Sequence, residues 1–168
     1  AEEKQSGTWE LLATKPLSKW AIILGKYMAG WMLVIVALLP VLLYYFIVSY
    51  LAEPVGNIDS GAFWGSFTGL ILLAAVYVAI GIFSSSLSNN QLVSFVTAVV
   101  ISFFMLYGFE LIGSFFNSGK LIYILENCGI QSHYKSISRG VIDSRDLIYF
   151  LIVIYIFLFF TEKKMTKN

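Results

Sequence analysis

Four long apolar stretches alternate with polar segments along the chain, and this pattern predicts its secondary structure. The four stretches cover approximately residues 20–50, 63–83, 92–112 and 147–160. A helix needs about 20 apolar residues to cross the hydrocarbon core of a bilayer, so the first three are long enough to span it. The fourth is short for a span unless its flanking residues extend it. The pattern predicts an all-α fold, a polytopic transmembrane helical bundle.

Polar segments divide the chain around these stretches. We expect a cytoplasmic segment over 1–19, a transmembrane region over 20–160 and a cytoplasmic tail over 161–168. The connection after the first stretch is short and rich in turn-forming residues such as Pro54. The connection over 117–146 is long and mixed in polarity, and we expect it to form an outer loop.

The composition agrees with a protein that lives in a bilayer. Apolar residues make up 58% of the chain and charged residues 12%, and the mean hydropathy is +0.80, far above the globular average. A net charge of +1 provides no basic field for nucleic acid. Cys128 is the only cysteine and His133 the only histidine, so the sequence excludes an internal disulfide and a multi-histidine metal site.

The distribution of basic residues predicts the orientation of the bundle. Seven of the eleven lie near the N-terminal end of the first stretch or after the C-terminal end of the last: Lys4, Lys15, Lys19, Lys26, Lys163, Lys164 and Lys167. Cytoplasmic flanks of membrane helices are enriched in Lys and Arg, so both ends are expected in the cytoplasm. The loop over 117–146 also contains basic residues, but long loops follow this rule less strictly.

Three glycines at the start of the second stretch are candidate packing residues. Gly61, Gly65 and Gly69 are spaced by four, so they share one face of a helix. Such a face lets another backbone come close.

Glu110 is the one acid embedded near a predicted span. Intramembrane acids mark transport or pairing sites by default, but Glu110 lies near the end of its stretch and could instead reach the outer headgroups. The sequence has no H-E-x-x-H motif, Walker loop or nucleophile elbow. His133 with Ser132 or Ser136 is the only conceivable acid–base pair. We therefore expect no enzyme activity, metal or cofactor in this chain.

The segment before the first stretch has the most specific pattern. It is charged and breaks at Gly7, and a short helix is expected from Thr8 to a point before Pro16. Glu10 falls in the first turn of that helix, where an acid favours the helix dipole. Apolar side chains lie beside the charged ones, which suits a docking surface. Ser18 can then cap the first span.

This segment resembles the E-E-x-x-x-G-T-x-E-x-L-x-x-x-P-x-S pattern of ABC-2 type transporter permeases. The matching residues are Glu2, Glu3, Gly7, Thr8, Glu10, Leu11, Leu12, Thr14, Pro16 and Ser18, followed by Gly25-Lys26. Two later stretches are similar to the same family, namely Gly81 to Leu87 with Asn90-Gln91, and His133-Tyr134 with Ser138 to Asp143. The last of these most resembles the gliding-motility-associated permease subfamily of Bacteroidetes-type bacteria.

The resemblance implies partners and a place within a larger protein. Family permeases have six spans, so we expect this chain to hold the coupling segment and spans three to six. A separate ABC ATPase subunit would supply ATP hydrolysis, and a second permease subunit would complete a homo- or heterodimer in the lipid bilayer. The residues expected to contact the ATPase are Glu2, Glu3, Gly7, Thr8, Glu10, Leu11 and Leu12.

The resemblance also implies that the loop before the last span dips back into the outer leaflet. We expect an amphipathic helix within 132–146, and helical spacing places Ile137, Val141 and Ile142 on its apolar face. The residues assigned to this re-entrant helix are His133, Arg139, Gly140 and Asp143. Arg139 is expected to meet lipid headgroups, Glu110 or Asp143.

The sequence therefore predicts a permease subunit of an ABC transporter in a bacterial inner membrane, an exporter linked to gliding motility. Two alternatives stay open. One is a secondary transporter that uses Glu110 as a proton or ion site. The other is a membrane-embedded enzyme that uses His133 or Glu110.

The charge distribution makes a topological prediction. In a variant with Cys128 replaced by serine, a cysteine at Ser6 should react with a membrane-impermeant thiol reagent only from the cytoplasmic side. A cysteine at Ser118 should react only from the opposite side, because 117–146 is expected outside. Labelling of Ser118→Cys from the cytoplasm alone would show that the topology is wrong.

Overall fold

Helices account for the regular structure of the chain. The computed structural model describes residues 18–116, 119–141 and 143–166, so the expected coupling residues from Glu2 to Leu12 lie outside the described residues. Its elements are α3 (Lys19–Leu51), α4 (Ser60–Leu87), α5 (Gln91–Phe103), the π-helix η1 (Phe104–Gly108), α6 (Phe109–Gly113), α7 (Gly119–Cys128), α8 (Ile130–Ser138) and α9 (Ser144–Thr166). No strand occurs in these ranges.

Four of the described helices are long and apolar enough to cross a membrane. They are α3, α4, the continuous run Gln91–Gly113 and α9. The predicted all-α bundle with four membrane-spanning helices is therefore confirmed.

Polar side chains fix where three of these helices begin. Ser18 accepts a hydrogen bond from the amide of Ala21 at 3.2 Å, which confirms its predicted capping role. Asp59 accepts from the amide of Ala62 and Asn90 from that of Leu92, each at 2.9 Å. Each cap satisfies an amide that has no partner within its own helix.

The last helix is longer than the apolar stretch that predicted it. α9 runs over Ser144–Thr166, whereas we expected a helix over about 147–160 followed by a tail. At its start, Asp143 accepts a hydrogen bond from the amide of Arg145 at 2.9 Å. At its end, Lys163 and Lys164 favour the negative end of the helix dipole. Polar residues with good helix propensity therefore extend the helix at both ends.

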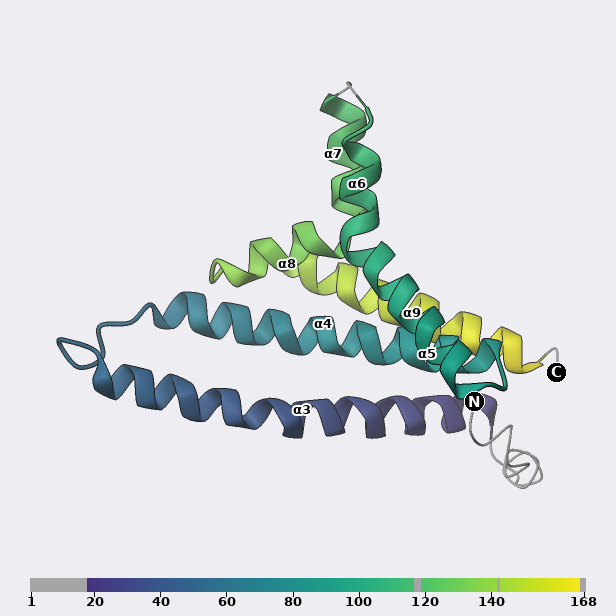
Figure 1. The fold of residues 1–168 in the computed structure, drawn as a ribbon, viewed down its shortest axis with the longest axis horizontal. Coiled ribbons are helices and arrows are strands. Elements are labelled where there is room, and N and C mark those ends of the chain that lie inside the picture. Colours follow the sequence, from purple (N-terminus) through teal and green to yellow (C-terminus); the bar gives the residue numbers. More distant parts are fainter. Residues whose placement is uncertain (1–17, 117–118, 142, 167–168) are drawn as a thin grey trace.

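Helix α4 is the central element of the bundle. It packs against α3, α5, α8 and α9, and α3 lies beside it in the opposite direction (Figure 1). The core includes Val76, Ala79 and Ile80 of α4 with Phe150 and Leu158 of α9.

Helix α3 begins and α9 ends at the same end of the bundle (Figure 1). Lys19 at the start of α3 donates a hydrogen bond to the carbonyl of Met165 near the end of α9, at 3.3 Å. The ring of Trp20 also stacks on that of Tyr155, with centroids 6.3 Å apart. These contacts place two cationic helix ends side by side.

The chain between α5 and α9 forms a bent excursion. Helices α6 and α7 run beside each other and project away from α3, α4 and α9, and α8 then lies along α4 (Figure 1). Three close approaches set the direction of α8. Gly140 lies against Gly61, Ile137 and Gly140 lie against Gly65, and Tyr134 and Ile137 lie against Gly69. Residue numbers fall along α8 as they rise along α4, so the two helices are antiparallel.

The glycine face of α4, formed by Gly61, Gly65 and Gly69, is packed most tightly at Gly65 and Gly69. A methyl group added at Gly65 would lie 2.6 Å from the Cα atom of Gly140 and would also collide with the carbonyl oxygen of Ile137. A methyl group added at Gly69 would lie 3.2 Å from the ring of Tyr134. Backbone therefore packs directly on backbone here.

This packing gives α8 its depth. Helix α4 has 28 residues, so it is about 42 Å long at 1.5 Å per residue, and the hydrocarbon core is about 30 Å thick. Gly69 lies nine positions after Ser60, so the middle of α8 is about 14 Å along α4 from its start. Ile130, at the beginning of α8, lies deeper still and is fully buried. Helix α8 is thus placed beside the first half of a membrane-spanning helix.

The glycine face predicts a position-specific effect of alanine. Gly65→Ala should lower the free energy of unfolding by about 1–3 kcal/mol, because the new methyl group meets rigid backbone. Gly81→Ala is the matched control: Gly81 lies in the same helix, and a methyl group there has no neighbour within 4 Å. It should be neutral or stabilising by up to about 1 kcal/mol. Thermal unfolding in detergent measures both, and equal effects would contradict the contact.

Candidate functional site

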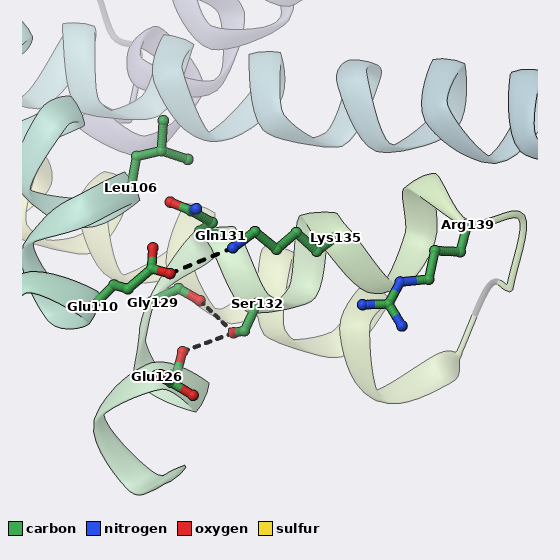
Figure 2. A pocket seen from close by; sticks show the side chains of 8 residues that line it. All are labelled: Leu106, Glu110, Glu126, Gly129, Gln131, Ser132, Lys135 and Arg139. Atoms are coloured by element: carbon green, nitrogen blue, oxygen red, sulfur yellow. Dashed lines mark hydrogen bonds and ion pairs between the residues drawn. The ribbon is translucent and has the colours of Figure 1, made fainter. Parts of the chain in front are cut away.

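A polar pocket lies where the excursion meets the bundle. It has a volume of about 320 Å³ and lies between η1, α6, the α7–α8 turn and α8 (Figure 2). Its lining residues are Leu106, Glu110, Glu126, Gly129, Gln131, Ser132, Lys135 and Arg139. Two carboxylates lie toward the α6–α7 side and the guanidinium of Arg139 lies toward the other end of α8 (Figure 2). The lining is thus neutral in sum and dipolar.

The π-helix determines which way Glu110 points. Residues Phe104–Gly108 insert one wide turn into an otherwise α-helical run. An extra residue rotates everything after it by about 100° around the helix axis. The ring of Phe104 folds over Gly108, where a methyl group would lie 2.5 Å from Cδ2 of that ring. Glu110 follows directly and lines the pocket.

Glu110 has a basic partner. Its Oε1 atom lies 3.4 Å from Nζ of Lys135, and the two side chains are 47% and 53% exposed. Glu110 was one of the partners expected for Arg139, beside lipid headgroups and Asp143, but Lys135 is the residue that pairs with this acid. Lys135 is one turn closer to the start of α8 and therefore closer to α6. An ion pair with this exposure contributes about 0–1 kcal/mol.

The expected amphipathic helix exists but ends earlier than 132–146. Helix α8 covers Ile130–Ser138. Gly140 has a φ of +85° and its amide donates to the carbonyl of Ile137 at 2.9 Å, which closes the helix. Ile137 is fully buried, but Val141 lies beyond the end of the helix and is 64% exposed. The prediction that Val141 shares the apolar face is therefore wrong, and Ile142 lies outside the described residues.

The other residues assigned to the re-entrant helix have separate positions. His133 lies within α8, Arg139 follows its last turn, and Asp143 precedes α9, where it accepts from the amide of Arg145. Arg139 makes no ion pair with another described residue. An apolar groove of about 410 Å³ adjoins the pocket and shares Glu110 with it; its other lining residues are Phe103, Tyr107, Leu111 and Ser114.

Beside the pocket, His133 forms a partly buried pair with Asp146 that sequence reasoning missed. Its Nδ1 atom lies 2.6 Å from Oδ1 of Asp146, and its Nε2 atom lies 2.9 Å from the carbonyl oxygen of Asn127. Tyr149 stacks on the imidazole ring with centroids 3.9 Å apart. Asp146 was not singled out because it precedes an apolar stretch, where an acid is an ordinary helix-start residue.

These contacts bear on the enzyme alternative. Both ring nitrogens of His133 are engaged with Asn127 and Asp146. The hydroxyl of Ser132 donates instead to the carbonyl oxygens of Glu126 and Gly129, at 2.7 and 3.0 Å. Neither nitrogen is therefore directed at Ser132 as a base for that hydroxyl. Among the described residues, no group of three or more His, Cys, Asp or Glu could hold a metal ion.

The fold and the pocket define a multi-pass membrane protein with a polar site at the edge of its bundle. Comparison with known proteins places it more closely: residues 1–161 match the family model of the ABC-2 family transporter proteins. The chain belongs to this family, and it is a membrane permease component of an ABC transporter that works with an ABC ATPase. No curated protein and no solved structure matches the chain.

The exposed ion pair yields a prediction for Glu110. Glu110→Gln should lower the free energy of unfolding by less than about 1 kcal/mol and should leave ATP-driven transport intact. Lys135→Gln removes the same pair from the other side and serves as the matched variant. Complete loss of transport in Glu110→Gln, but not in Lys135→Gln, would instead support Glu110 as an ion or proton site.

Proposed function

We propose that this chain is the transmembrane part of a bacterial inner-membrane exporter, with both of its ends in the cytoplasm. The observation that carries the proposal is the family match over 1–161, which includes the charged segment before α3. Support for the orientation comes from the shared end of the bundle. There, Lys19 and Lys26 of α3 lie on the same side as Lys163 and Lys164 of α9, as the enrichment of cytoplasmic flanks in basic residues predicts.

The contacts of α3 provide a route from an ATPase to the bundle. Residues 1–17 would bind the ATPase, and α3 follows that segment directly. Its first turns contact α9 through Lys19 and Trp20, and its buried residues Ile23 and Tyr27 belong to the common core with α4 and α9. A push on the start of α3 would therefore move α3, α4 and α9 together. Movement of packed helices as bodies is a common mode of conformational switching.

Helix α8, which lines the polar pocket, lies beside the first half of α4, whereas the start of α3 lies near the other end of α4 (Figure 1). Helix α8 is fixed to α4 through the glycine face, so rocking of α4 would carry the pocket with it. We propose that the pocket and its adjoining groove border the exit of the translocation path. The second permease subunit, identical or related, would complete that path. In alternating access, ATP binding and hydrolysis shift the population between two arrangements of the spans.

The link to gliding motility rests on the resemblance of the region from His133 to Asp143. In a gliding host, loss of this protein should abolish surface spreading, and expression of the unaltered protein should restore it. Normal spreading without the protein would remove this assignment but leave the transporter assignment in place.

The coupling role makes a prediction for the segment before α3. Gly7→Pro or Glu10→Lys in the assembled transporter should keep membrane insertion but separate ATP hydrolysis from transport. The reason is that each change alters the expected docking helix and leaves the spans intact. Measurement of ATPase activity and substrate movement in proteoliposomes tests this, with Gly81→Ala as the control. Unchanged transport and ATPase binding in both variants would contradict the coupling role.

A further inference from the structure

Asp146 is the only charged side chain that is buried among the described residues, at 6% exposure. Its Oδ2 atom is fully buried and has no hydrogen-bond partner, and its Oδ1 atom contacts only His133. Because α8 lies beside the first half of α4, this carboxylate sits at membrane depth. A bare carboxylate there is costly, so its charge must be compensated locally.

The contacts of His133 fix how many protons the pair holds. A carbonyl oxygen only accepts hydrogen bonds, so Nε2, which faces the carbonyl of Asn127 at 2.9 Å, must carry a hydrogen. Nδ1 faces a carboxylate oxygen at 2.6 Å. Two atoms that both lack hydrogen would repel at this distance, so a proton lies between them. The pair therefore holds one proton more than a neutral histidine beside an ionised aspartate.

The proton joins three elements of the excursion. Asn127 belongs to α7, His133 to α8 and Asp146 to α9. Tyr149 of α9 reinforces the junction, because its ring stacks on the imidazole and its hydroxyl donates to the carbonyl of Cys128 at 2.7 Å. Without the additional proton, the single hydrogen of the ring cannot serve both Asp146 and Asn127, so one of the two contacts of His133 becomes repulsive.

Few other ionisable groups surround the pair. Helix α7 contributes Glu126 and Cys128, α8 contributes Lys135, and α9 contributes Arg145 and Tyr149; α4 has no acidic or basic side chain. Lys135 pairs with Glu110 on α6. No described acid or base other than the two partners forms an ion pair with His133 or Asp146, so the proton balance belongs to this couple.

We propose that His133 and Asp146 form a proton-binding site, and that its proton closes the junction of α7, α8 and α9 beside the polar pocket. The proton-bound site is neutral in sum and holds the junction closed. Loss of the proton as the pH rises leaves a net negative charge and one ring hydrogen for two acceptors. That hydrogen stays on Nδ1, because the carboxylate is the stronger acceptor, so a bare Nε2 faces the carbonyl of Asn127 and the junction opens on the side of α7. The site does not depend on which substrate the transporter moves or on how the ATPase couples.

The protonation state is measurable directly, because His133 is the only histidine in the sequence. The chain is labelled with ¹⁵N-histidine and assembled with an unlabelled ATPase subunit in lipid nanodiscs. Its imidazole signals are followed by NMR across a pH series from about 5.5 to about 9.5. We expect the Nε2 signal to move to that of a bare nitrogen at high pH, while Nδ1 stays protonated against the carboxylate. A bare Nε2 at every pH would contradict the extra proton. A bare Nδ1 at every pH would overturn the proposal.

The opening is measurable at Cys128, the only cysteine of the sequence, whose side chain is exposed. A spin label there, with an ATPase subunit free of cysteine, should be immobilised at low pH and lose that immobilised component at high pH. Asp146→Asn is the matched variant, because its amide can either donate to or accept from Nδ1. Its label should stay immobilised at every pH. His133→Ala should be mobile at every pH.

The variants separate a proton switch from a structural contact. Wild-type mobility that does not change with pH would overturn the proposal, and so would a pH response in Asp146→Asn equal to that of the wild type. If His133→Ala does not fold, the comparison of wild type with Asp146→Asn decides the question alone. Failure of either test leaves the assignment as a permease untouched.

Discussion

The close approach of α8 to the glycine face of α4 is the contact on which the rest of this structure depends. Gly61, Gly65 and Gly69 let α8 and Gly140 come close, and at Gly65 a side chain would collide with the backbone of Ile137 and Gly140. The positive φ of Gly140 closes α8 at the same place. Because α8 carries His133 and Lys135, this contact also sets the depth of the polar groups. A packing motif without chemistry of its own thereby positions the site.

Polar groups at that depth are stable only when neighbouring residues provide hydrogen-bond or ion-pair partners for them. The excursion provides partners from neighbouring elements: Lys135 for Glu110, and His133 for Asp146. The two pairs differ in kind. The first is half exposed and contributes little to stability. The second is buried, and removal of either partner would leave an uncompensated group, which is strongly destabilising in protein interiors. The buried pair is therefore the element of this region most sensitive to protonation.

Much of the fold could be predicted from the sequence. Long apolar runs identify membrane-spanning helices because the bilayer fixes their length, and Ser18 was identifiable as a cap from its place before the first run. The spacing of Gly61, Gly65 and Gly69 indicated a packing face but could not name its partner. The partner, α8, is adjacent in space and 61 or more positions away in sequence.

The site was less predictable, for physical reasons. The π-helix at Phe104–Gly108 leaves no signature in the apolar pattern, and it changes the direction of Glu110. Gly140 was expected within the re-entrant helix, whereas its left-handed backbone ends that helix and leaves Val141 exposed. Asp146 resembles any acid at the start of a helix. Its pairing with His133 depends on the return of α8 along α4, which no local pattern encodes.

A disulfide across the glycine face tests the central claim most directly. The Cβ position of a residue at Gly69 lies 3.3 Å from Cγ2 of Ile137, so the two Cβ positions are at most about 5 Å apart, close to the separation found in disulfides. In a Cys128→Ser background, Gly69→Cys with Ile137→Cys should crosslink on mild oxidation in the membrane. Cleavage at the exposed Lys120 should then leave one band until a reductant is added. The pair Gly81→Cys with Ile137→Cys should not crosslink. Two fragments from the first pair without reductant, or equal crosslinking of both pairs, would contradict the placement of α8 on α4.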